Sequence, residues 1–194
     1  SENGLRLKYD AVFKNVNADT LGNSKKYISG SHMELLSEFQ YTLDYPLKKI
    51  GKKYDSFFTP KISTRFSPNK TKNISSDDRR IDYDNIFSLN RLKRRDVVEG
   101  GESITIGSEY SKKNKQNKEV LSFDVATSLR VKENKDLPTK TNLGKKQSDF
   151  VGSFKLKPFD LINLDYDFSY ENDFENVNYQ SIQLQSKINN FVTT

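Results

Sequence analysis

Long stretches of this chain alternate apolar and polar side chains, and this alternation constrains the fold more than any other feature. In the segment 162–171 an apolar residue occupies every even position, from Ile162 to Tyr170, and a polar residue occupies every odd one. A period of two places successive side chains on opposite faces of a β-strand. Strands of soluble sheets average about five or six residues, whereas a tilted strand that crosses a bilayer needs roughly nine to eleven. The pattern therefore predicts membrane-crossing strands in the wall of a β-barrel.

About eight segments carry this alternation and are predicted to be strands. They span residues 5–13, 33–47, 56–67, 102–111, 120–131, 147–156, 161–171 and 178–188. Phe191 is predicted to begin a further strand. Pro60 lies inside the third segment and weakens that prediction, because proline has no N–H to donate within a sheet. The predicted fold is all-β, an antiparallel meander within a single partial barrel domain over residues 1–194.

The connections between these segments alternate in length. Long connections at residues 14–32, 68–101 and 132–146 follow the odd-numbered segments, and short ones at 48–55, 112–119 and 157–160 follow the even-numbered ones. The connection 172–177 departs from this order, and Asn189–Asn190 are predicted to form a tight turn after the eighth segment. A meander across a membrane has long loops on one side and short turns on the other. A soluble β-sandwich has no reason to keep that order.

Composition excludes several kinds of chemistry. The sequence contains no cysteine, which rules out disulfides, thiolate zinc sites and cysteine nucleophiles. Its one histidine, His32, is predicted to be a loop residue, and alone it cannot build a zinc site or a catalytic triad. No apolar run approaches the roughly 18 residues of a transmembrane helix. We therefore expect no catalytic residues, no cofactor and no metal site, and we do not expect an enzyme.

The net charge of +6 suggests an anionic partner such as lipid phosphate or nucleic acid, unless it only reflects the amino-acid usage of the source genome. Two basic clusters, at 91–95 and 112–115, are both predicted to lie in connections. Neither contains an aromatic residue, whereas nucleic-acid-binding surfaces usually interleave aromatic residues with Lys and Arg. Nucleic acid is therefore not predicted as a partner.

The connection after the third segment holds the most distinctive string of the sequence. Its marked residues are Arg80, Asp84, Asn85, Phe87, Asn90, Arg91, Arg95 and Asp96. This block resembles one in the barrel domain of the LPS-assembly protein family (LptD, also called OstA or organic-solvent-tolerance protein). There a D-[NY]-[LI]-F-x-x-N-R core is followed by a short spacer, R-D and an acidic residue. We expect the block to order the long connection through packing and ion pairs.

Sequences around the block extend the resemblance. The string Tyr45-Pro46-Leu47 is similar to a strand end of the family, and 59–62 with 65–68 is similar to its "x-P-x-[IV]-x-x-[RQ]-[YF]-x-P" strand. The resemblance thus accounts for Pro60. The family's N-terminal periplasmic jellyroll, its cysteines and its closing strand have no counterpart here. The chain is therefore expected to be a fragment of the C-terminal outer-membrane β-barrel domain.

The resemblance implies a fold, a function and partners. The fold would be part of a large transmembrane β-barrel in the outer membrane of a Gram-negative bacterium. The function would be that of a translocon component that inserts lipopolysaccharide (LPS) into the outer leaflet without covalent chemistry. The implied partners are LPS, an LptE-like outer-membrane lipoprotein plug and an LptA-like periplasmic LPS bridge. Candidate contacts to lipid phosphate in the lumen are Lys61, Arg65, Arg130, Lys155 and Lys187, although each could instead balance a neighbouring carboxylate.

Two other kinds of protein fit the same alternation. A small self-contained porin-like or adhesin outer-membrane barrel could close with eight strands, and its first and last strands would then pair. A soluble periplasmic glycan-binding β-protein would instead cover its apolar strand faces with a second sheet.

Overall fold

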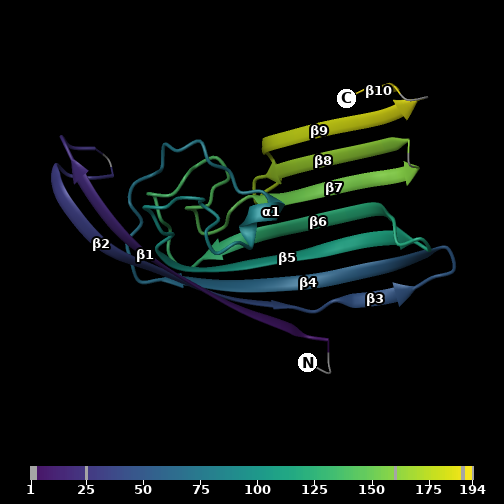
Figure 1. Ribbon diagram of the computed structural model, residues 1–194, viewed down its shortest axis with the longest axis horizontal. Helices are drawn as coiled ribbons and strands as arrows, with labels where there is room; N and C mark the ends of the chain where they lie inside the picture. The colour runs from purple at the N-terminus through teal and green to yellow at the C-terminus, as the bar shows by residue number, and fades with distance from the viewer. Residues whose placement is uncertain (1–3, 25, 160, 189–190, 194) are drawn as a thin grey trace.

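A computed structural model describes residues 4–24, 26–159, 161–188 and 191–193 of the chain, so the predicted turn at Asn189–Asn190 lies outside the described residues. The described residues form one ten-stranded sheet (Figure 1). Its strands are β1 (Arg6–Thr20), β2 (Gly30–Asp44), β3 (Leu47–Ile50), β4 (Tyr54–Ser67), β5 (Gly101–Asn114), β6 (Glu119–Arg130), β7 (Phe150–Phe159), β8 (Ile162–Tyr170), β9 (Val177–Ile188) and β10 (Phe191–Thr193). The short helix α1 (Tyr83–Ile86) lies between β4 and β5. Within the described ranges, no helix has the length and apolar character needed to span a membrane.

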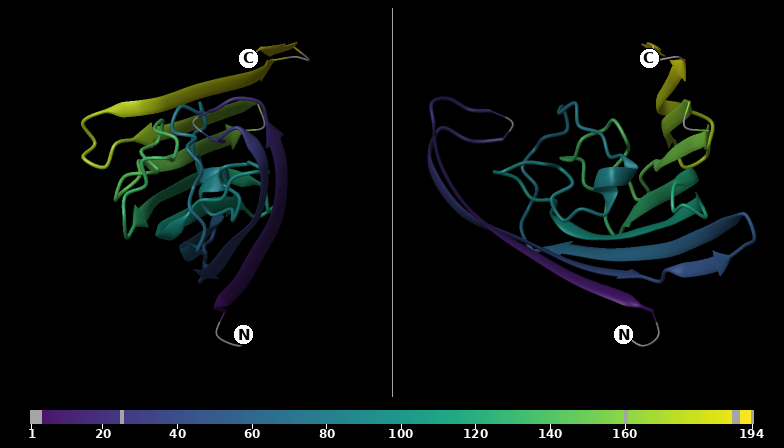
Figure 2. Two further views of the ribbon diagram at one scale, coloured as in Figure 1. Left: turned by 90° about the vertical axis from the view of Figure 1, so that its left-hand side faces the viewer. Right: turned by 45° about the vertical axis from the view of Figure 1, so that its right-hand side comes forward.

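The sheet is an antiparallel meander, as predicted. Its order is β1-β2-β4-β5-β6-β7-β8-β9-β10, with β3 also paired to β4. The sheet curves strongly but stays open, and β1 and β10 lie at its opposite edges (Figure 2). In the described part of the chain, β1 pairs with β2 alone. This arrangement does not provide the pairing of first and last strands that a self-contained eight-stranded barrel requires.

Each predicted segment overlaps a strand, but several boundaries were wrong. The segment predicted at 147–156 lies three residues later, as β7. β1 continues past residue 13 to Thr20. The prediction stopped too early because the apolar side chains change to the other face of the strand at Val16, which packs on Leu36 and Val98. A test for apolar residues on a single face cannot detect such a change. β2 begins at Gly30, so His32 is a strand residue paired with Ala18 rather than a loop residue. β5 runs to Asn114, which places Lys112 and Lys113 in a strand rather than in a connection.

The predicted strand 33–47 is divided by two prolines. β2 pairs with β4 as far as Asp44 opposite Lys61, and β3 resumes at Leu47 opposite Phe58 in the same register. Pro46 and Pro60 lie in the gap, and neither has an N–H to donate to the neighbouring strand. One hydrogen bond bridges the gap, from the Tyr45 N–H to the Pro60 carbonyl at 3.1 Å. Proline chemistry therefore interrupts the ladder without shifting it.

The register separates an apolar outer face from a polar inner face. Exposed side chains on the outer face include Leu7, Tyr9, Phe13, Phe39, Phe58, Ile62, Phe66, Ile104, Ile106, Phe123, Leu129, Ile162, Ile182 and Leu184. Buried polar side chains on the inner face include Glu38, Gln40, Thr42, Ser63, Arg65, Ser103, Thr105, Ser128 and Arg130. No second sheet covers the outer face within the described residues, contrary to what a soluble sandwich requires.

Two long connections fold together against the inner face. We call residues 68–100 and 131–149 the loop body; Figure 2 shows it on the concave side of the sheet. Its apolar core consists of Ile74, Ile81, Ile86, Leu92, Val97, Leu137 and Leu143, which pack against Ala126 and Val151 of the sheet. The Ile74 N–H donates to the Asp136 carbonyl at 2.8 Å, so the two connections also share backbone hydrogen bonds. The hydrophobic core of this chain therefore lies between its loops and its sheet.

Candidate functional site

A buried ionic cluster fastens the loop body to the inner face. Glu99, the carboxylate at its centre, is 1% exposed and lies at the end of the connection 68–100. Arg91, from the same connection, donates its Nε–H to Glu99 at 2.6 Å. Arg65 of β4 lies 3.2 Å from the same carboxylate, and Arg130 of β6 also binds it. One loop carboxylate therefore joins two strands that are not adjacent in the sheet.

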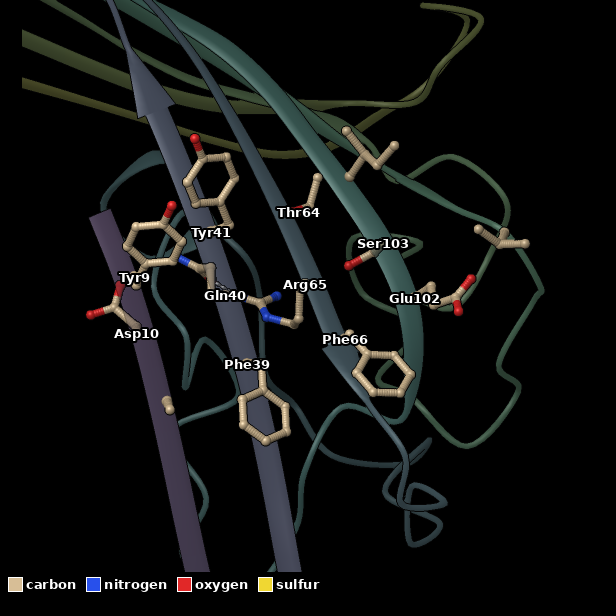
Figure 3. Close-up of a pocket in the computed structure, with 13 residues that line it drawn as sticks. Tyr9, Asp10, Phe39, Gln40, Tyr41, Thr64, Arg65, Phe66, Glu102 and Ser103 are labelled. Carbon is tan, nitrogen blue, oxygen red and sulfur yellow. Dashed lines mark hydrogen bonds between the residues drawn. The ribbon is translucent and has the colours of Figure 1, made fainter. Parts of the chain in front are cut away.

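The remaining donors of the three guanidinium groups reach other acceptors. Arg65 Nη2 donates to Gln40 Oε1 on β2 at 2.7 Å (Figure 3) and to the backbone carbonyl of Ser88. Arg91 Nη1 donates to the Ser128 hydroxyl at 3.1 Å. Burial by itself raises the pKa of Glu99, but the adjacent guanidinium groups outweigh it and hold that pKa well below its usual range. Glu99 is therefore ionised, with three cations around it.

The two N-terminal strands hold the same end of the loop body. Glu38 of β2 accepts a hydrogen bond from the Glu99 N–H at 2.7 Å. Lys14 of β1 donates to the carbonyls of Arg94 and Val97, each at 2.9 Å. At Gly100 an added Cβ would lie 2.2 Å from the Asn69 carbonyl oxygen, so only glycine lets the two ends of the connection approach this closely. The cluster thus draws together four strands and both ends of one loop.

The distinctive string begins with a capped helical turn. Asp82 caps α1 by accepting the Asn85 N–H at 2.8 Å, and the Asn85 side chain accepts the Asp82 N–H in return. This cap buries Ile86 in the loop core and leads to Phe87, whose ring lies 4.9 Å from the Lys61 ammonium. Asp82 was not among the predicted residues, although an acidic residue three positions before Asn85 is a recognisable N-cap signal.

The other residues of the string differ in whether their side chains make contacts. The Arg80 guanidinium lies over the Tyr179 ring at 4.7 Å, and the Asn90 amide oxygen is 3.4 Å from the Lys14 ammonium. Asp96 pairs with Lys26 in the first connection. The side chains of Asp84 and Arg95 are exposed and make no hydrogen bond or ion pair with any described residue. Arg94, rather than Arg95, forms an ion pair, which is with Asp77.

The five candidate lumen cations divide into two groups. Arg65 and Arg130 belong to the Glu99 cluster, and Lys61 pairs with Glu109. Lys155, in contrast, lines a cavity of about 410 Å³ between residues 80–84 and the inner face of β7, β8 and β9. This cavity also contains Asp165, Asp167 and Gln183, while Lys187 is exposed on β9. The structure therefore pairs three of these cations with carboxylates, places Lys155 in the cavity beneath the loop body and leaves Lys187 exposed.

The outer face has an apolar hollow near β1, β2 and β4 (Figure 3). Its volume is about 580 Å³, and the rings of Tyr9, Phe39, Tyr41 and Phe66 line it along three neighbouring strands. The Tyr9 and Tyr41 rings are 4.8 Å apart. Among the described residues, no group of three or more His, Cys, Asp or Glu side chains is arranged to hold a metal ion. The features of the chain are thus an apolar face, a polar face and an anchored loop body.

An antiparallel meander with an apolar outer face and loops packed on a polar inner face is typical of the wall of a membrane β-barrel. The family model described as "LptD: LPS transport system D" matches residues 6–193. The chain therefore belongs to the LptD family, as its distinctive string predicted. This family is a lipopolysaccharide transport and assembly component of the Gram-negative outer membrane, not an enzyme family. No curated protein matches the chain at a significant level.

Proposed function

We propose that this chain forms part of the wall of a large transmembrane β-barrel, a translocon component that inserts LPS into the outer leaflet without covalent chemistry. The observation that carries the proposal is the uncovered apolar outer face. A row of cross-strand partners, Phe58, Tyr110, Phe123, Phe154 and Tyr166, crosses it from β4 to β8. A contiguous apolar surface of this extent needs an apolar neighbour.

Strand length supports a lipid neighbour. The strands β4 and β8 have 14 and 9 residues, and a tilted strand needs roughly nine to eleven to cross a bilayer. A protein partner would not require this length, whereas a hydrocarbon layer of about 30 Å does. The open edges at β1 and β10 then have a role, because further strands of a larger barrel would pair with them.

The two faces suggest how an amphipathic lipid is handled. On the inner side, Lys155 and its polar neighbours offer donors and acceptors to phosphorylated sugars, whereas Lys61, Arg65 and Arg130 are already paired with carboxylates. Acyl chains would remain at the apolar outer side. The loop body lies at the end of the sheet with the long connections, which corresponds to the extracellular mouth of a barrel. An LptE-like plug and an LptA-like bridge remain the proposed protein partners.

If the outer face contacts the membrane, a lysine substitution should have different effects on stability at two neighbouring positions of β9. Leu184 is 56% exposed on the outer face, and the next residue, Gln185, lies on the inner face. Leu184→Lys should lower the free energy of unfolding in lipid vesicles by about 1–4 kcal/mol, and the loss is larger the closer residue 184 lies to the bilayer midplane. Gln185→Lys, the matched control, should change it by less than about 0.5 kcal/mol. Urea titration of both variants in vesicles measures the difference, and equal effects would contradict the proposed membrane contact.

LPS transport can be followed by photo-cross-linking in cells. A photoreactive residue at Gln183 would face the Lys155 cavity, and one at Ile182 would face outward. After a pulse of labelled LPS precursor, we expect adducts at position 183 to appear first and then decline as the label leaves. Adducts at position 182 should accumulate later, as LPS collects in the outer leaflet. Accumulation at 182 with no earlier adduct at 183 would show that LPS does not pass this inner surface.

Depletion of the protein in the organism that encodes it separates the proposed function from a porin. Loss of a translocon component should reduce the amount of newly made LPS on the surface of intact cells, because the LPS then remains on the inner side of the outer membrane. Loss of a small porin-like barrel should instead slow the uptake of polar solutes and leave surface LPS unchanged. The second result would contradict the proposed function.

A further inference from the structure

A second outer-face pocket is lined by residues of β3, β4 and β5. Figure 1 shows β3 and the neighbouring ends of β4 and β5 at the end of the sheet opposite the loop body. Its volume is about 620 Å³. Leu47, Phe58 and Tyr110 are direct cross-strand partners and form its apolar floor. The next row toward the short turns places Lys49 and Lys112 on either side of Ser56. The pocket is therefore apolar toward the middle of the sheet and basic toward its end.

Four lysines line this pocket, and three of them have no counter-ion among the described residues; the fourth, Lys48, pairs with Asp55. Lys49 and Lys112 on the strands and Lys53 in the turn all line the pocket. Among the described residues, no Asp or Glu side chain lies within ion-pair distance of these three ammonium groups. The nearby carboxylate, Asp55, points to the inner face and is shared by Lys48 and Lys115. Three unpaired cations above an apolar floor fit an anion attached to a hydrocarbon chain.

We infer that this pocket binds the head group of an anionic phospholipid. The lysines would hold the phosphate, and the acyl chains would run over Phe58 and Tyr110 toward the middle of the outer face. Aromatic residues beside Lys at the limit of an apolar band are typical of a membrane–water interface. The short turns of outer-membrane barrels are periplasmic, so the lipid would belong to the inner leaflet. This inference rests on the proposed membrane position of the sheet but not on LPS passage.

Native mass spectrometry of the full-length protein, extracted from membranes in detergent, tests the site. The probes are dioleoylphosphatidylglycerol, which is anionic, and dioleoylphosphatidylcholine, which is zwitterionic. Each juxtamembrane lysine contributes about 1 kcal/mol to binding an anionic surface, which is about fivefold in affinity. The triple variant Lys49→Gln, Lys53→Gln, Lys112→Gln should therefore bind the anionic lipid about a hundredfold more weakly, and phosphatidylcholine binding should be unchanged.

Two further variants control for charge and folding. Replacing the same lysines with Arg should retain binding, because the positive charges remain. Removing three exposed lysines at the opposite end, with Lys132→Gln, Lys135→Gln and Lys146→Gln, changes the net charge equally and should leave binding within about twofold of the wild type. If this distant variant loses as much affinity as the rim variant, net charge and not a pocket governs binding, and the assignment is wrong.

A competition arm distinguishes a lipid site from a phosphate site. Inorganic phosphate in hundredfold excess should leave bound phosphatidylglycerol in place, because phosphate cannot occupy the apolar floor. Complete displacement by phosphate would overturn the lipid assignment, as would equal binding of both lipids. Since binding in detergent needs no transport, loss of this site and failure of the LPS cross-linking experiment are separate results.

Discussion

Replacing Glu99 with Gln is expected to lower the free energy of unfolding by about 3–5 kcal/mol, because it removes one partner of a buried ionic cluster. The amide would leave the guanidinium groups of Arg65, Arg91 and Arg130 without the anion that compensates for their burial. The free energy is measured by urea titration of the protein in detergent micelles. Limited proteolysis should show new cleavage within residues 68–100, because the Glu99 carboxylate joins the end of this connection to Arg65 and Arg130 of the sheet.

A matched control and a pH series make this prediction specific. Glu102, three residues further along, is exposed, and Glu102→Gln should change the free energy by less than about 0.5 kcal/mol. Because the pKa of Glu99 is lowered on folding, its ionisation stabilises the protein above the unfolded pKa of about 4.3. That contribution declines as the pH falls toward the folded pKa. The difference in the free energy of unfolding between wild type and Glu99→Gln should thus be largest at pH 7 and should decrease below about pH 4. A difference that increases in acid would contradict the prediction.

Replacing Ile86 with Ala should have an effect of similar size through packing alone. The Ile86 side chain is completely buried where the loop body meets the sheet. Removing its outer carbons leaves a cavity, and Ile→Ala substitutions in cores cost about 2–5 kcal/mol. The loss should be the same at pH 7 and at pH 3, unlike that of Glu99→Gln, because no ionisable group is removed. Urea titration at both pH values measures it.

Ile50→Ala is the matched control for this substitution. Ile50 is the last residue of β3 and is 74% exposed. Figure 1 shows β3 at the end of the sheet opposite the loop body. The same chemical change there should cost less than about 0.5 kcal/mol. Equal losses at positions 86 and 50 would show that the loop core does not contribute to stability in the way its burial indicates.

Alternation along the sequence predicted most of the sheet, because the face of the sheet on which a strand side chain lies follows from the positions of its sequence neighbours. Segment 161–171 corresponds to β8 with the predicted even-numbered residues outward. The prediction failed where that local rule changes within one strand. At Val16 the inner face becomes apolar, because Leu36 and Val98 provide a partner that lies far along the chain.

The candidate site was predictable in part. The string from Arg80 to Asp96 identified the family and the connection that becomes ordered. It did not identify Glu99 or Glu38 as anchors, because their partners come from β4, β6 and β1. Likewise, Lys49 and Lys112 became neighbours of one pocket only through the register of β3, β4 and β5.

By itself, the sequence determined that this chain forms long antiparallel strands with one apolar face, since an alternation of period two can be recognised from neighbouring residues alone. It also determined the family, through a string that needs no folding to be recognised. Only the tertiary structure decided where the loops lie and which charges are paired. The physical reason is that a buried charge is tolerated only where packing brings its partners within hydrogen-bonding distance, and residues as far apart as Arg65 and Arg130 meet Glu99 only after the sheet has assembled.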